Sequence, residues 1–93
     1  MSFKDQPYDV ELTSIALKHL RRYPANDRRR ILSRIEQLAA DPSVMPNVKQ
    51  LVDFGVTYRL RVGNYRVFFD RDDTIRIIDV IDVLPRGRAY RRK

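Results

Sequence analysis

The chain has 93 residues and a formal net charge of +7, with 43% hydrophobic and 33% charged residues. This length and balance are typical of one compact domain, so we predict a single domain over residues 1–93 with a basic tail over 85–93. The sequence has no cysteine and a single histidine, His19. That composition excludes a disulfide framework, a thiolate nucleophile and a histidine-rich metal site, and we expect neither a metal nor a cofactor.

The positive charge comes from 15 arginines and only 4 lysines. The planar guanidinium binds phosphate through two hydrogen bonds and stacks on bases, so this choice favours a nucleic acid or an acidic protein partner. The alternative explanation for the excess of arginine over lysine is a GC-rich genome. The positions of the arginines in the fold must decide between the two explanations. The sequence shows no apolar run near the roughly 18 residues of a membrane span and no signal peptide, so we expect a cytoplasmic protein without a membrane partner.

The N-terminal half predicts a strand followed by two helices. Alternating apolar residues over 8–12 indicate a short strand. Thr13 can cap a first helix, which is expected to end near Tyr23 because proline follows. Apolar residues at spacings of three and four predict a second helix from residue 26 or 27 to Ala40. Two short helices this close in sequence are expected to form a hairpin.

The C-terminal half has the pattern of strands. Residues 58–62 and 65–69 alternate on either side of Gly63–Asn64, a typical β-hairpin turn. A third apolar run covers 74–83, and its apolar residues on both faces favour a central or bulged strand. The pattern also allows a short strand over 49–52. We therefore predict an α+β fold, with an N-terminal helical hairpin packed on an antiparallel sheet.

A two-residue turn at 63–64 fixes which side chains of this hairpin share a face. Arg61 lies opposite Arg66, and like charges in that position disfavour the sheet. Either the arginines reach solvent, Asp79 or Asp82, or they bind an anion, and we favour the anion because three arginines converge beside an aromatic ring. The face away from the helices carries Arg59, Arg61, Arg66 and Phe68.

The basic tail follows the last strand directly, with Arg86, Arg88 and Tyr90 in its first residues. A disordered tail is the alternative, but Tyr90 and Pro85 favour packing or stacking. If the last strand lies beside strand 65–69, the tail emerges at one end of the arginine-bearing face. The result would be a basic concavity with an aromatic platform, which suits RNA phosphates and bases.

These motifs together resemble a known superfamily. The run YRLRVGNYRVFF over 58–69, the strand after it and PRGRAYR over 85–91 resemble the RelE/ParE toxins, and most closely the RelE branch. The segments ALKHLRRYP (16–24) and RILSRIEQLAADP (30–42) are similar to the helical hairpin of that family. The resemblance covers about residues 8–91. It implies a microbial RNase-like α+β fold, with an N-terminal helical hairpin on a four-stranded antiparallel sheet.

The resemblance also implies a function, the toxin of a bacterial type II toxin–antitoxin system. Such a toxin is a ribosome-dependent endoribonuclease that cuts mRNA in the ribosomal A site and inhibits translation. A 2′-hydroxyl attacks the adjacent phosphate and leaves a 2′,3′-cyclic phosphate. The implied partners are the ribosome and mRNA, an acidic cognate antitoxin, and operator DNA only through the antitoxin complex.

The resemblance also implies functional residues, which we assign to the matching positions of this sequence. The sequence departs from the family pattern in two ways that affect the implied mechanism. Pro85 stands where many relatives have histidine, and arginine replaces lysine at 59 and 61. Because arginine effectively never deprotonates, the arginines would hold the phosphate, while Tyr90 stacks on a base or assists proton transfer. The predicted catalytic residues are Arg59, Arg61, Arg66, Arg86 and Tyr90, and the further RNA-binding residues are Phe68, Arg88 and Arg91.

Two other functions stay open. A ParE-like toxin would inhibit DNA gyrase by protein binding, and such relatives share the fold but commonly lack the basic cluster. A non-catalytic binding module would use the arginines only to hold an acidic partner. Elsewhere, we expect His19 at the surface or in packing. Arg28–Arg30 are expected on a solvated helix face, with RNA contact as the alternative.

Overall fold

A computed structural model describes residues 7–52 and 55–89. Within these residues the chain forms one mixed sheet of five strands in the order β1-β5-β4-β3-β2. In chain order, the elements are β1 (Asp9–Leu12), α1 (Ser14–Arg22), α2 (Ala25–Ala40), β2 (Val48–Gln50), β3 (Tyr58–Val62), β4 (Tyr65–Asp72), β5 (Ile77–Pro85) and α3 (Arg86–Ala89). In the same part of the chain, none of the helices is long and apolar enough to span a membrane.

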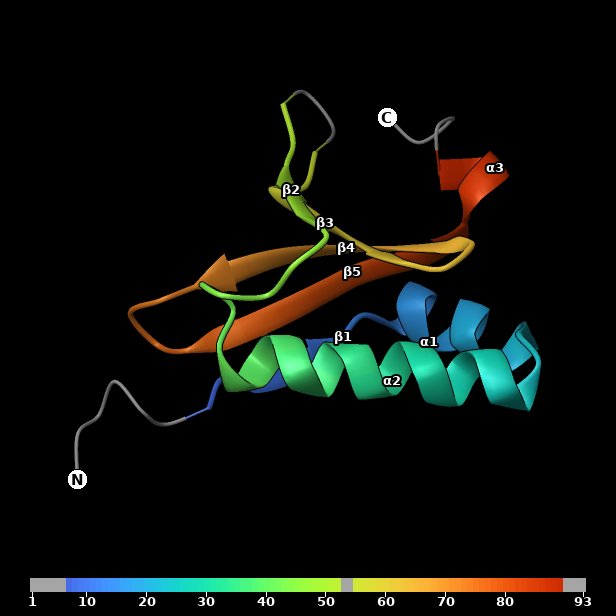
Figure 1. The fold of residues 1–93 in the computed structure, drawn as a ribbon, viewed down its shortest axis with the longest axis horizontal. Helices are drawn as coiled ribbons and strands as arrows, with labels where there is room; N and C mark the ends of the chain where they lie inside the picture. Colours follow the sequence, from blue (N-terminus) through green and yellow to red (C-terminus); the bar gives the residue numbers. More distant parts are fainter. Residues whose placement is uncertain (1–6, 53–54, 90–93) are drawn as a thin grey trace.

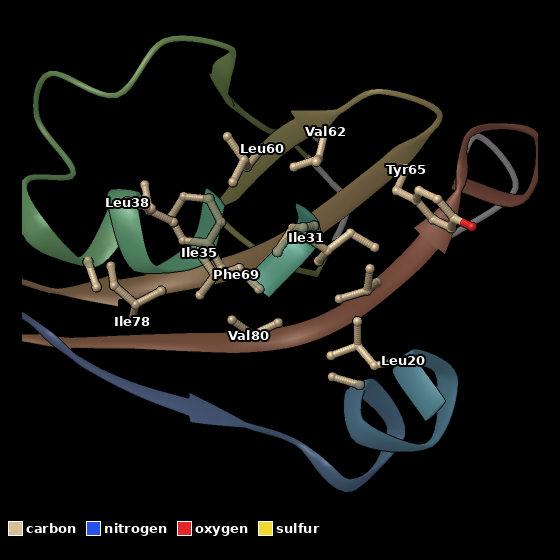
Figure 2. Close-up of a cluster of buried hydrophobic side chains, with 14 residues drawn as sticks. Leu20, Ile31, Ile35, Leu38, Leu60, Val62, Tyr65, Phe69, Ile78 and Val80 are labelled. Carbon is tan, nitrogen blue, oxygen red and sulfur yellow. The ribbon is translucent and has the colours of Figure 1, made fainter. Parts of the chain in front are cut away.

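The helices are distributed unequally over the two faces of the sheet. Figure 1 shows α1 and α2 on one side and α3 on the other, at the end where β3 turns into β4. The main core fills the space between α1, α2 and the sheet, and Figure 2 shows its side chains. Removing this apolar surface from water is the main force that holds the helices to the strands. Core residues from both layers include Leu20, Ile31, Ile35, Leu38, Leu60, Val62, Phe69, Ile78 and Val80.

Thr13 joins the start of α1 to the sheet. Its hydroxyl accepts a hydrogen bond from the backbone N–H of Ala16 at 3.1 Å, which satisfies one of the unpaired donors of the first helical turn. The same hydroxyl donates to the carbonyl of Ile81 in β5 at 2.6 Å. The predicted helix start is confirmed, and the cap also fixes where α1 lies on the sheet.

The β3–β4 hairpin has the predicted register. Arg61 is opposite Arg66 and Val62 is opposite Tyr65. Gly63 begins the turn with a φ of 55°, in the left-handed region that favours glycine. Apart from Phe68, the apolar side chains of both strands face α1 and α2, so the arginines are directed to the opposite face or to its edges.

The predicted N-terminal helical hairpin on a four-stranded antiparallel sheet is wrong in two respects. The helices follow the first strand, in the order that the alternation over 8–12 predicted, but they pack on different strands, α1 mainly on β5 and α2 on β1 and β3, rather than as one N-terminal hairpin. In addition, β1 pairs in parallel with β5, with Asp9 opposite Ile77, and β2 adds a further strand at the other edge. Parallel strands need a long crossover, and here it runs through α1, α2 and the β2–β4 strands.

The prediction of a central or bulged last strand is confirmed, because β5 lies between β1 and β4. Phe68 is opposite Asp82, but the next residue, Phe69, is opposite Val80, so Ile81 is the extra residue of a β-bulge. Val80 packs in the main core, whereas Ile81 packs on the other face. The bulge shifts the alternation of β5 by one residue, so that Val80 and Val83, three residues apart, both pack in the main core.

Candidate functional site

The face of the sheet away from α1 and α2 has a small core of its own. Phe68 is 1% exposed and packs against Val56 and Leu84, with Leu51 and Ile81 at the margin. The predicted base-stacking role of Phe68 would need an open ring face. A base could reach this ring only if its apolar neighbours moved away, so in this structure the side chain contributes to packing.

Next to this small core, at the β3–β4 turn, lies an open pocket of about 620 Å³ that collects arginines from four elements. Its size falls within the range of about 300–1,000 Å³ that is usual for ligand sites. Among the described residues, none of those that line it is acidic. The lining residues are Arg30 and Arg34 of α2, Asn47, Arg61 and Val62 of β3, Gly63 and Asn64 of the turn, Arg66 of β4 and Arg86 of α3.

Arg66 is the most constrained cation of the pocket. It is 4% exposed, and its Nη1 donates to the carbonyls of Gly63 at 3.0 Å and Tyr65 at 2.9 Å. Its Nε is buried without a hydrogen-bond partner, and no ion pair joins it to a carboxylate of the described residues. Burying a charge without a counter-charge is costly, and an anion in the pocket would offset that cost.

Arg61 and Arg86 are exposed and reach the same pocket from two other elements. The backbone N–H of Arg86 donates to the carbonyl of Asn64 at 2.6 Å, which ties the start of α3 to the turn. Because β5 lies beside β4, the tail starts at the end of the sheet where the arginines gather, as predicted. Tyr90 and Arg91 lie outside the described residues.

Two other predicted residues lie outside the pocket lining. Arg59 is half-buried between Lys49 and Phe68 on the neighbouring strands, and its Nε is buried without a hydrogen-bond partner. Arg88 is exposed on α3. The pocket therefore brings together Arg61, Arg66 and Arg86 of the predicted set.

The predicted site residues do not include Arg30 or Arg34. Arg30 was expected on a solvated helix face, with RNA contact as the alternative, and no function was predicted for Arg34. Both line the pocket, and a Cβ atom at Gly63 would lie only 2.9 Å from the Nη2 of Arg30. The available signal was their spacing, because residues i and i+4 share one helix face. It could not be used without knowing which face of α2 is turned to the hairpin.

Comparison with known proteins gives the family. The sequence profile of the ParE toxin of type II toxin–antitoxin system, parDE, matches residues 10–90, most of the chain. The chain belongs to the ParE toxin family. The predicted membership of the RelE/ParE superfamily is thereby confirmed. A search of curated protein sequences finds no match.

Solved structures support the fold of this ParE-family toxin. It is similar to the archaeal RelE–RelB complex from Pyrococcus horikoshii OT3, with a TM-score of 0.76 and 29% identity over 89% of this chain and 99% of that one. It is also similar to the RelB–RelE antitoxin–toxin complex from Methanococcus jannaschii, with a TM-score of 0.68 and 25% identity over 86% of this chain and 94% of that one. The RelBE2 toxin–antitoxin complex from Mycobacterium tuberculosis shares the fold, with a TM-score of 0.75 and 24% identity over 87% of this chain and 100% of that one.

A hydrogen-bonded pair beside the toxin's pocket holds the N-terminal part of α2. The hydroxyl of Tyr65 donates to Asp27 Oδ2 at 2.7 Å, and the Tyr65 ring packs against Tyr23 with centroids 4.7 Å apart. The hydrogen bond to the carboxylate, together with burial, raises the pKa of Tyr65 to about 12. The phenol is therefore a neutral donor at physiological pH, and it positions Asp27 rather than titrating.

His19 has a structural partner away from the pocket. Its Nδ1 lies 2.7 Å from Oδ1 of Asp82, which is 3% exposed and also accepts the backbone N–H of Val83 at 2.8 Å. This agrees with the expected packing role of the histidine. Asp82 is engaged here by His19 and by the backbone of Val83. Within the described part of the chain, no cluster of three histidine or acidic side chains could hold a metal ion.

Three acidic residues lie near the opposite end of the sheet, at the β4–β5 connection. Asp70 accepts the backbone N–H of Thr57 at 2.7 Å, and Asp72 accepts those of Thr74 and Ile75 at 2.9 and 3.1 Å. Arg71 donates to both oxygens of the neighbouring Asp73, which lowers the pKa of that carboxyl. These charges are satisfied locally by backbone or by ion pairing.

Proposed function

We propose that this toxin is a ribosome-dependent endoribonuclease that cleaves mRNA in the ribosomal A site and so inhibits translation. The observation that carries the proposal is the pocket at the β3–β4 turn. It gathers Arg61, Arg66 and Arg86 from three elements, with no acidic residue among its described lining. Such a site suits a phosphodiester, because guanidinium groups bind phosphate oxygens through paired, charge-assisted hydrogen bonds.

In the proposed reaction, the 2′-hydroxyl oxygen of one nucleotide attacks the adjacent phosphorus. The P–O bond to the 5′-oxygen of the next nucleotide breaks, leaving a 2′,3′-cyclic phosphate and a 5′-hydroxyl. Negative charge builds on the phosphate oxygens during this step. Donors already fixed in place stabilise such charge without reorganising, and the two carbonyl contacts of Arg66 hold its guanidinium in this way.

Proton transfer is a separate requirement. The 2′-hydroxyl must lose a proton and the leaving oxygen must gain one, yet arginine does not deprotonate and the described lining contains neither histidine nor carboxylate. We assign this step to Tyr90, which either assists proton transfer or stacks on a base while the ribosome orients the message. Arg59, Arg88 and Arg91 would add positive charge around the strand.

We further propose a cognate antitoxin as protein partner. The structures from P. horikoshii and M. jannaschii are complexes of RelE with RelB, and a basic pocket of this kind suits acidic side chains of a neutralising partner. Contact with operator DNA would occur only through the antitoxin complex.

A ParE-like action on DNA gyrase is the second candidate, and a specific observation favours it. The matching family profile is that of the ParE toxin, and inhibition by protein binding would need no proton-transfer group. The arginine pocket favours the ribonuclease over this reading.

The decisive experiment is to induce the chain in cells and to map message ends by primer extension. We expect cuts at A-site codons, and we expect Arg66→Ala to reduce them by about 100-fold or more, the usual effect of losing one fixed donor of charge stabilisation. An Arg66→Ala, Tyr90→Phe double variant should abolish them. Arg29→Ala is the matched control, because Arg29 is exposed and lies outside the pocket lining.

Other outcomes would separate the alternatives. Intact messages with stalled replication would contradict the ribonuclease and support the gyrase reading. Growth without any toxicity would contradict both toxin activities and leave a binding module.

A further inference from the structure

The arginine pocket is larger than the proposed cleavage chemistry needs. Arg61, Arg66 and Arg86 account for one phosphodiester, but the same pocket continues across the β3–β4 turn to α2, where Arg30 and Arg34 complete its lining. A volume of about 620 Å³ accommodates more than one phosphate group. The two α2 arginines have no part in the cleavage proposed above.

Only some of the α2 arginines face this pocket. Arg28 donates to the carbonyl of Tyr23 at 3.2 Å, near the end of α1, and Arg29 bonds to Asn26 and lines a separate apolar hollow with Val10 and Leu32. Arg30 and Arg34 share the remaining face because they are four residues apart. Like charges at this spacing weaken a helix, so their placement calls for a compensating interaction.

Arg30 is positioned rather than loose, although its side chain is 56% exposed. Its guanidinium lies over Gly63, where any Cβ atom would crowd it. Its Nη2 is 3.8 Å from Oδ1 of Asp27, and the other oxygen of that carboxylate accepts the Tyr65 hydroxyl. At 3.8 Å the ion pair is long for a hydrogen bond, so the donors of Arg30 remain available to a ligand.

Arg34 is also without a strong partner. Its Nη1 donates to the amide oxygen of Gln37 at 3.3 Å, an exposed and neutral contact. The described lining thus offers five cations and no carboxylate. A single phosphodiester neutralises one of these charges, whereas a strand segment brings one phosphate per nucleotide.

We propose that Arg30 and Arg34 form a second phosphate subsite, next to the Arg61–Arg66–Arg86 subsite across Gly63. It would bind a phosphodiester that neighbours the cleaved one in the same RNA strand. The subsite deepens the proposed ribonuclease function and rests on it for the identity of the strand. Its consequence is that the toxin grips the message at two consecutive positions and so sets which bond lies at Arg66.

The test measures binding without cleavage. A fluorescein-labelled single-stranded RNA hexamer with 2′-O-methyl riboses lacks the attacking hydroxyl, and fluorescence anisotropy gives its affinity for the purified chain at several salt concentrations. For single strands, the slope of log K against log[salt] is about −0.7 per phosphate contact. We expect Arg30→Ala, Arg34→Ala to weaken binding about 10-fold and to make the slope shallower by about 0.7 or more.

The control must remove the same charge elsewhere. Arg22→Ala, Arg29→Ala also removes two cations, both exposed and outside the pocket lining, and it should retain an affinity and slope near those of the wild type. Thermal melts of both double variants verify folding. If the two double variants behave alike, or if the wild type does not bind the hexamer, the subsite is wrong.

A second experiment, cosedimentation with ribosomes, identifies the RNA strand that supplies the phosphate. If the α2 double variant keeps its hexamer affinity but sediments poorly with ribosomes that have an empty A site, the phosphate belongs to ribosomal RNA and the same-strand subsite is wrong. A wild type that binds the hexamer through Arg30 and Arg34 but cuts no message contradicts the proposed function and leaves the subsite standing.

Discussion

The two ends of the sheet use charge in opposite ways. At the end that carries the β4–β5 connection, acidic side chains are satisfied within the fold, as Asp70 is by Thr57 and Asp72 by Thr74 and Ile75. At the end that carries the β3–β4 turn and α3 (Figure 1), arginines gather without carboxylates in the described lining, and the Nε of Arg66 is buried without a partner. The difference teaches that charge at one end is satisfied within the fold, whereas the other end presents cations that suit the anion of the proposed function.

The small core around Phe68 lies on the same face as the arginines. Substitutions there should give the largest effect among the tests that separate stability from function. Removing a buried phenylalanine side chain costs about 3–5 kcal/mol, so we expect Phe68→Ala to lower the free energy of unfolding by that amount in urea denaturation. Phe68→Leu keeps an apolar side chain and should retain both folding and message cleavage. A folded Phe68→Leu variant that no longer cleaves would show that the ring contacts RNA.

Asp72→Ala tests the acidic end with an intermediate effect. The substitution removes an acceptor of two backbone hydrogen bonds, each worth about 0.5–1.5 kcal/mol. We expect a Tm lower by roughly 4–8 °C for each kcal/mol lost, with unchanged A-site cleavage at a temperature where the chain is folded. Loss of cleavage in a variant that remains folded would contradict the separation of the two ends.

Tyr65→Phe gives the smallest effect near neutral pH, about 1 kcal/mol for the hydrogen bond to Asp27. Its pH dependence is more informative. The folded chain holds the Tyr65 proton up to a pKa of about 12, above the ordinary value of 10.0. The stabilisation is therefore complete below pH 10, and it is lost as the pH rises toward 12.

Urea denaturation between pH 9 and 11 measures this difference. The free energy of unfolding of the wild type should fall faster with pH than that of the phenylalanine variant. Parallel curves would show that Tyr65 titrates normally and that Asp27 is held in another way.

Local patterns predicted much of the fold and part of the site. The alternation around Gly63–Asn64 predicted the β3–β4 register correctly, including Arg61 opposite Arg66. A two-residue turn between two strands of alternating pattern allows only one pairing of their residues. The parallel pairing of β1 was missed, since alternation over 8–12 does not encode a partner 68 residues away.

The predicted site lacked Arg30 and wrongly left Phe68 open to a base, for a similar physical reason. The place of Arg30 at the pocket depends on how α2 is rotated over the sheet, which tertiary packing decides. The burial of Phe68 depends on the segment around Val56, whose sequence has no periodic signal. Both features come from contacts between distant segments, so a reading of neighbouring residues could not reveal them.

The parallel pair of β1 and β5 has a consequence for synthesis of the chain. Asp9 pairs with Ile77, and the pocket draws residues from Arg30 to Arg86. Contacts this distant in sequence form slowly, and none of them can form before β5 has left the ribosomal exit tunnel. The emerging chain therefore carries its arginines without the pocket, and the ligand site is assembled only after translation of nearly the whole described chain.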